Sequence, residues 1–133
     1  MWLLKTEPGT YSYDDLEREG RATWDGVSSP AALKNLRAMQ VGETAVVYHT
    51  GAQRAAVGLA RVVRASYPDP RSKDPRLVVV DLQALRRLRE PVSLADLKLS
   101  PLFAQSPLIK QGRLSVLPLT PEQLRAIETG RLG

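Results

Sequence analysis

Three stretches rich in β-branched and small apolar residues occupy the middle of the chain, at residues 44–49, 55–67 and 77–88. A turn at Thr50-Gly51 follows the first stretch, and a polar loop with three prolines, residues 68–75, separates the second from the third. Helical patterns lie before and after these stretches without a regular alternation of strand and helix. Because a parallel sheet needs that βαβ alternation, the sequence predicts an α+β fold with a mainly antiparallel, curled sheet.

Short helices are predicted around these stretches, because a capping hydroxyl precedes each helical pattern. The candidate N-caps are Ser12, Ser29, Ser93 and Thr120. Two further short strands are predicted, at residues 2–5 and 113–119, whereas residues 102–109 fit helical turns interrupted by prolines. No repeat, linker or low-complexity segment divides the chain. We therefore expect residues 1–133 to form a single domain, long enough to bury one core.

The residue content excludes several classes of chemistry. The chain has no cysteine and one histidine, His49, which excludes a disulfide framework and thiolate chemistry and argues against a zinc site. No glycine-rich phosphate loop, dinucleotide fingerprint or nucleophile elbow is present. No run of ~18 apolar residues and no basic leader occurs. We expect a cytoplasmic monomer that binds no membrane, metal or cofactor.

Positive charge is concentrated in the middle of the chain. Of 19 basic and 14 acidic residues in all, nine basic and four acidic ones fall within residues 50–90. Most of the basic residues are arginines, whose planar guanidinium suits phosphate contacts. The candidate phosphate contacts are Arg54, Arg61, Arg86 and Arg87. The same pattern also fits a solvated basic face without a nucleic-acid partner, and charge alone does not decide between the two.

Five short, dispersed blocks carry the polar and aromatic residues that remain as candidates for a binding site. They are Lys5-Thr6-Glu7-Pro8, Trp24-Asp25-Gly26-Val27, Tyr48-His49-Thr50, Tyr67-Pro68-Asp69 and Gln111-Gly112-Arg113-Leu114-Ser115-Val116. Gly26 permits a tight turn, beside which Trp24 either lines a pocket or fills the core.

Each block also has a purely structural interpretation. Lys5 and Glu7 fit an ordinary surface ion pair, and Asp69 between two prolines fits a turn. His49 on an apolar strand is more often a hydrogen-bonded core or edge residue than a base contact. Arg113 and Ser115 alternate with apolar residues, as on the polar face of a half-buried strand. No single block therefore identifies a binding site.

Taken in order, the five blocks resemble those of the EVE domain family, a branch of the PUA-like superfamily related to the YTH and ASCH domains. The resemblance covers nearly the whole chain. It implies a PUA-like mixed β pseudo-barrel with short surrounding helices. It also implies a non-enzymatic module that takes a methylated or otherwise alkylated base of DNA or RNA, flipped from its stack, into an aromatic-lined pocket. The implied binding residues are Lys5, Thr6, Glu7, Trp24, Asp25, Gly26, Val27, Tyr48, His49, Thr50, Pro68, Asp69, Arg113 and Ser115. In such a pocket an aromatic face returns about 1–3 kcal/mol per stacked base, and the candidates for that role are Trp24 and Tyr48. The candidates for contacts to the base edge are Glu7, Asp25, His49 and Thr50, with Val27 beside an alkyl group.

The chain departs from the family pattern directly after Val27. The family usually continues with Arg-Asn-Tyr, whereas this chain has Ser28-Ser29-Pro30, so an amide and an aromatic ring are missing from the pocket rim. Two alternatives therefore stay open. One is a small hydrolase of modified nucleosides that uses Lys5, Thr6 and Glu7, although alternation along a strand turns Thr6 away from the other two. The other is a pocket for a different small ligand or a protein partner.

Overall fold

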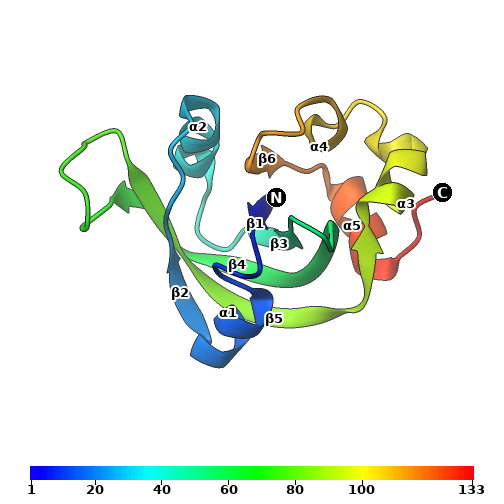
Figure 1. The fold of residues 1–133 in the computed structure, drawn as a ribbon, viewed down its shortest axis with the longest axis horizontal. Coiled ribbons are helices and arrows are strands. Elements are labelled where there is room, and N and C mark those ends of the chain that lie inside the picture. Colours follow the sequence, from blue (N-terminus) through cyan, green and yellow to red (C-terminus); the bar gives the residue numbers. More distant parts are fainter.

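Six strands form one sheet in the computed structural model, which describes residues 1–133. They are β1 (Trp2–Thr6), β2 (Arg21–Trp24), β3 (Thr44–His49), β4 (Ala55–Pro68), β5 (Val78–Ser93) and β6 (Val116–Pro118). Their order across the sheet is β2-β5-β4-β3-β1-β6, and only β1 and β3 run parallel. The sheet is curled, with short helices around it (Figure 1). The predicted α+β fold with a mainly antiparallel sheet is confirmed.

Five short α-helices and one 3₁₀ helix surround the sheet. They are α1 (Tyr13–Glu19), α2 (Pro30–Ala38), α3 (Leu94–Leu99), η1 (Pro101–Phe103), α4 (Pro107–Lys110) and α5 (Pro121–Thr129). The four predicted N-caps are confirmed, because the hydroxyl of each accepts a hydrogen bond from a backbone amide in the first turn of its helix. They are Ser12, Ser29, Ser93 and Thr120. A cap needs only neighbours in sequence, which is why the sequence predicts these helix starts. None of the helices has the length and apolar character needed to span a bilayer.

The structure differs from the sequence prediction at two strands. Residues 21–24 carry no strong strand signal, yet they form β2 by pairing antiparallel with β5. Trp24 therefore ends a strand instead of standing within a turn. The strand predicted at residues 113–119 is reduced to β6, because the chain still turns just before it: the Leu114 amide donates to the Gln111 carbonyl at 2.9 Å.

Two hydrophobic cores lie on opposite faces of the sheet. Alternation along β1 and β3 sends Leu4 and Val47 into the core that packs against α1 and α2, which also contains Trp24. The same alternation sends Leu3 and Tyr48 into the second core, which packs against α3, η1, α4 and α5. Trp24 and Tyr48 therefore belong to different faces of the sheet.

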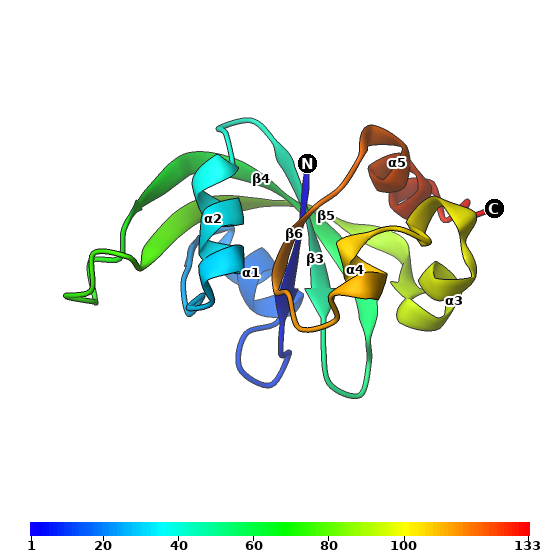
Figure 2. The ribbon, with the colours of Figure 1, turned by 90° about the horizontal axis from the view of Figure 1, so that it is seen from above.

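The β4–β5 hairpin gives the sheet its curvature. The pairing register shifts repeatedly along the two strands, and such bulges bend a strand and increase its twist. The tip of the hairpin, residues 69–76, projects from the body of the molecule in both views (Figures 1 and 2). We refer to residues 69–76 as the arm.

Candidate functional site

A cleft of about 900 Å³ opens beside β2, between the end of β1 and the arm. It is lined by Lys5, Thr6, Glu7, Thr10, Tyr11, Glu19, Arg21, Ala22, Thr23, Trp24, Asp25, Gly26, Val27, Asp69, Pro70, Arg71, Asp81 and Ser115. Its volume falls within the range of small-ligand sites, roughly 300–1,000 Å³. Most of the predicted binding residues lie in this lining: the blocks at residues 5–7 and 24–27 complete, together with Asp69 and Ser115.

Trp24 and Tyr11 form an aromatic corner in the cleft. Their ring centroids are 6.0 Å apart and their planes meet at 87°, which is an edge-to-face contact. Trp24 is 6 % exposed, so it both fills the core and contributes to the lining. Tyr11 is half-buried, and burial together with a hydrogen bond that its hydroxyl donates to Glu19 raises its pKa. Sequence reasoning missed Tyr11, whose signal was an aromatic ring directly before the α1 cap.

Lys5, Thr6 and Glu7 all contribute to the cleft lining. Alternation along β1 still separates the side chains of Lys5 and Thr6, as predicted: Lys5 Nζ lies 5.9 Å from the centroid of the Tyr48 ring, on the face of the second core, whereas Thr6 has the parity of Leu4. β1 ends at Thr6, and the chain then turns, since the Tyr11 amide donates to the Glu7 carbonyl at 2.9 Å. The Thr6 hydroxyl donates to the Tyr11 carbonyl at 2.7 Å, and Lys5 Nζ donates to the Gly112 carbonyl at 2.8 Å. Burial lowers the pKa of Lys5. Backbone carbonyls therefore hold both side chains, and no basic side chain contacts the Thr6 hydroxyl.

Asp81 of β5 anchors a polar network on the opposite wall. Its Oδ1 accepts hydrogen bonds from the Tyr67 hydroxyl at 2.5 Å and from the Thr23 hydroxyl at 3.0 Å. The Arg64 guanidinium lies 3.6 Å from the centroid of the Tyr67 ring, a cation–π contact. These residues come from β2, β4 and β5, so only the folded sheet brings them together. The sequence signal for Asp81 was an isolated acid within the apolar run at residues 78–82.

The arm borders the mouth of the cleft through Asp69, Pro70 and Arg71. The Arg71 guanidinium lies 3.6 Å from the carboxylate of Asp25, which follows β2. Asp69 forms a turn, as its structural interpretation predicts: its carboxylate accepts from the Arg71 amide at 2.9 Å, and its amide donates to the Leu77 carbonyl at 3.0 Å. One ion pair thus spans the space between the arm and β2.

Asp74 holds the tip of the arm through hydrogen bonds from the guanidinium and the amide of Arg76. These bonds lower the pKa of the Asp74 carboxyl to about 2. A depressed carboxyl pKa adds stability above the ordinary value, which is lost as the pH falls through about 2. We expect the Asp74 side-chain carboxyl carbon, followed by NMR, to titrate near that pH. A midpoint near the ordinary value of about 3.9 would show that the Arg76 contact does not form in solution.

Tyr48 and His49 do not line the cleft. Tyr48 is 3 % exposed and packs in the core on the other face of the sheet. Because it packs on that other face and is not part of the lining, the structure does not bring Tyr48 into this cleft beside Trp24. His49 Nε2 accepts from the Tyr13 amide at 3.0 Å, which leaves Nδ1 to donate to Gln53 Oε1 at 2.8 Å. Both ring nitrogens of His49 are therefore used within the fold, and the ring caps an amide of α1.

The remaining predicted base contacts also lie outside the lining. The Thr50 amide donates to the Thr6 carbonyl at 2.9 Å and so links β3 to the end of β1. Pro68 is the last residue of β4, and Arg113 is exposed two residues before Ser115, which does line the cleft. Thr50 and Pro68 support the residues of the cleft wall without belonging to it.

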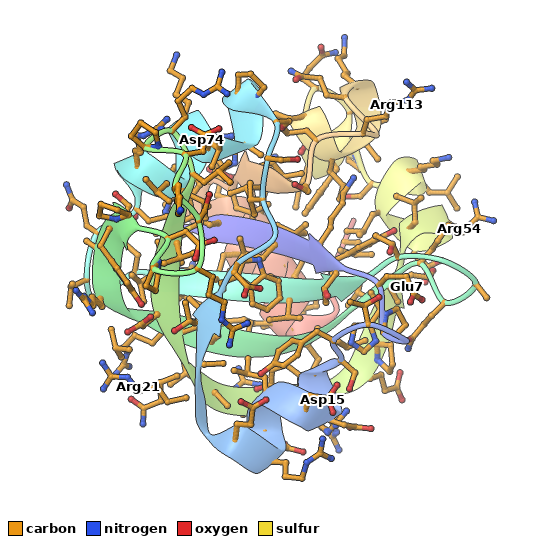
Figure 3. The ribbon with its side chains drawn as sticks, turned by 60° about the vertical axis from the view of Figure 1, so that its left-hand side comes forward. Glu7, Asp15, Arg21, Arg54, Asp74 and Arg113 are labelled. Atoms are coloured by element: carbon orange, nitrogen blue, oxygen red, sulfur yellow. The ribbon has the colours of Figure 1, made fainter.

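The predicted phosphate contacts are placed away from the cleft as well. Arg86 pairs with Glu128 of α5 at 3.1 Å, and Arg87 pairs with Asp14 and Glu17 of α1. Arg61, on β4, and Arg54, in the β3–β4 turn, are exposed but are not part of the lining. Figure 3 shows Arg54 and Arg113 on the side of the molecule near Glu7, with Arg21 on the other side.

The lining of the cleft carries more acidic than basic side chains. The carboxylates are Glu7, Glu19, Asp25, Asp69 and Asp81. The cations are Lys5, Arg21 and Arg71, of which Arg21 and Arg71 were not among the predicted contacts. A carboxylate only accepts hydrogen bonds, so the polar groups of the cleft match a ligand edge that donates. No group of three or more histidine or acidic side chains could hold a metal ion.

The curled six-stranded sheet with short helices on both faces places the protein in the PUA-like class of α+β folds. The family model of the EVE domain matches residues 1–129, and the chain belongs to the EVE domain family. Human thymocyte nuclear protein 1 is 32% identical over an alignment of 157 positions, gaps included, that covers 92% of this chain and 69% of that protein.

Two solved structures show how far the likeness extends. A crystal structure of a protein from Agrobacterium tumefaciens is 34% identical, with a TM-score of 0.92 over 98% of this chain and 92% of that one. The crystal structure of human THYN1 in complex with DNA containing 5-methylcytosine is 31% identical, with a TM-score of 0.86 over 96% of this chain and 95% of that one. A relative with nearly the same fold thus forms a complex with methylated DNA.

Proposed function

We propose that this protein is a non-enzymatic reader that takes a single modified base of DNA into the cleft beside β2. The observation that carries the proposal is the aromatic corner of Trp24 and Tyr11, set among hydrogen-bonding groups in a cleft of about 900 Å³. Removing a base from its stack costs a few kcal/mol, and aromatic contacts return about 1–3 kcal/mol. The complex of human THYN1 with DNA containing 5-methylcytosine supports a role in binding methylated DNA.

The carboxylates of the cleft select among bases. Cytosine and adenine present an amino group, whereas thymine presents a carbonyl oxygen at the corresponding position. Glu7 has an exposed carboxylate with no hydrogen-bond or ion-pair partner within the protein, and Asp81 Oδ2 is likewise unbonded. These acceptors favour an amino-bearing base. Val27, packed against the core beneath the cleft, offers an apolar contact for a methyl group.

Recognition fits the geometry better than hydrolysis does. A hydrolase that uses Thr6 as a nucleophile needs a general base at its hydroxyl, and that hydroxyl donates to the Tyr11 carbonyl instead. Lys5 is held by the Gly112 carbonyl and does not contact Thr6 Oγ1. All three residues contribute to the lining, but the hydrogen bonds of the Lys5 and Thr6 side chains go to backbone carbonyls and do not assemble a reacting set.

The proposal is tested with labelled oligonucleotides that carry one 5-methylcytosine, cytosine, N6-methyladenine, adenine or thymine at the same site, as duplex DNA and as RNA. Fluorescence anisotropy should show tighter binding to a methylated amino base in DNA than to its unmodified partner, and the weakest binding to thymine. Equal affinity for all the oligonucleotides would contradict the proposal. Release of a product from alkylated or acylated nucleosides, followed by chromatography, would favour the hydrolase.

A further inference from the structure

Arg71 stands at the point where the arm and the cleft meet. It is part of the cleft lining, and its side chain is 86 % exposed, so it is accessible from solvent. Its contact is the Asp25 carboxylate, 3.6 Å away and itself 46 % exposed. An exposed ion pair at this distance contributes little to stability and is screened by salt. Arg71 can therefore leave Asp25 at little cost when a stronger anion arrives.

The arm holds Arg71 in place through its own hydrogen bonds. The Arg71 amide donates to the Asp69 carboxylate at 2.9 Å, and the Ser72 amide donates to the Asp69 carbonyl at 3.1 Å. At the base of the arm, an Arg37 guanidinium nitrogen donates to the Arg76 carbonyl at 2.5 Å. These contacts fix the backbone that carries Arg71 and leave its side chain free to change partner.

Lys5, Arg86 and Arg87 are less suited to hold a nucleic-acid strand, and Arg21, the third cation of the lining, is exposed on β2 and not on the arm. Lys5 Nζ is engaged with the Gly112 carbonyl and is half-buried. Arg86 and Arg87 pair with carboxylates of α5 and α1, outside the lining. A base inserted into the cleft carries its own phosphates to the mouth, where the planar guanidinium of Arg71 matches a phosphate in bidentate geometry.

We propose that Arg71 exchanges the Asp25 carboxylate for a backbone phosphate next to the captured base, so that the arm is the element that holds the nucleic-acid strand. This inference rests on the proposed function. The exchange also frees the Asp25 carboxylate at the cleft rim, where it becomes an additional acceptor for an amino-bearing base. Strand contact and base recognition are thereby coupled through one ion pair.

The test measures affinity for a methylated duplex and its unmodified partner, across a series of salt concentrations. Arg71→Ala should weaken binding to both duplexes alike by about tenfold, as expected for one charge-assisted hydrogen-bonded contact, and reduce the slope of log affinity against log salt by about 1. Asp25→Asn should strengthen binding to the unmodified duplex by about twofold to threefold, because it removes the competing carboxylate. In the Arg71→Ala background, Asp25→Asn should give no gain in affinity for the unmodified duplex.

Lys73→Ala is the matched control, because Lys73 is an exposed cation of the same arm that does not line the cleft. It should leave affinity and salt slope close to those of the wild type. If the wild type discriminates between the duplexes while Arg71→Ala matches Lys73→Ala, the Arg71 proposal is overturned and the proposed function stands. If Arg71→Ala lowers the affinity and the salt slope but the wild type does not discriminate between the duplexes, the phosphate contact of Arg71 is supported and the proposed base recognition is overturned. A wild type that binds neither duplex overturns both.

Discussion

Replacing Gly58 with alanine is expected to destabilise the protein at the upper end of the ~1–3 kcal/mol that overpacking a core costs, or beyond it. A Cβ at Gly58 would lie 2.5 Å from two carbons of the Tyr13 ring. The ring cannot retreat freely, because Tyr13 is fully buried and its hydroxyl donates to the Leu59 carbonyl at 2.7 Å. Relief of the clash therefore requires a shift of β4 or of α1.

Urea unfolding measures this effect, and Gly112→Ala is the control. Gly112 has no atom within 4 Å of an added Cβ and no positive φ, so the same substitution there should change the unfolding free energy by less than about 0.5 kcal/mol. Tyr13→Ala should make the Gly58→Ala change less costly, because the clash disappears with the ring. If Gly58→Ala is as mild as Gly112→Ala, the Tyr13–Gly58 contact is not as close in solution.

The contact between Tyr13 and Gly58 also bears on the cleft. Tyr13 begins α1, and its amide donates to His49 at 3.0 Å, so the helix is fastened at its first residue. The segment from Tyr11 to Glu19 runs through α1 and supplies two residues of the cleft lining. We therefore expect Gly58→Ala to weaken ligand binding as well, through misplacement of Tyr11 relative to Trp24.

Local signals account for the parts of the fold that the sequence predicts correctly. The cap at Ser12 depends on Asp15, three residues away, and the cap at Thr120 depends on Gln123 in the same way. β2 could not be predicted on this basis, because its only strand partner is β5, about sixty residues away in sequence. A strand of this kind is determined by packing and pairing more than by its own residue types.

The sequence identifies the cleft residues that are consecutive in the chain. It does not identify those that only the folded sheet brings together. Residues 5–7 and residues 24–27 each contribute to the cleft lining as a consecutive segment. Sequence reasoning could not place Tyr48 relative to the cleft, because alternation shows which residues of a strand share a face and not which face meets the cleft; the fold puts Tyr48 in the second core. Arg71 and Asp81 join the lining through the long β4–β5 hairpin, whose register no local pattern sets.

Trp24→Ala is expected to remove base discrimination and to cost the fold about 3–5 kcal/mol, the range for truncating a buried aromatic residue. The two effects have one cause, because Trp24 packs in the core and also lines the cleft. Loss of the Trp24 indole removes the edge-to-face contact with Tyr11, whose ring centroid lies 6.0 Å from that of Trp24, and leaves space beside the Tyr11 ring. Trp24→Phe keeps an aromatic ring and should lose less of both properties.

Leu36→Ala separates the two roles of Trp24. Leu36 is fully buried in the same core, on α2, and it does not line the cleft. Its truncation should cost about 2–5 kcal/mol and preserve the ratio of affinities for methylated and unmodified duplexes, measured at a temperature where each variant is folded. If Trp24 only fills the core, Trp24→Ala will behave in the same way. If Trp24 forms the wall against which the base stacks, the ratio will fall toward one in Trp24→Ala while Leu36→Ala keeps it.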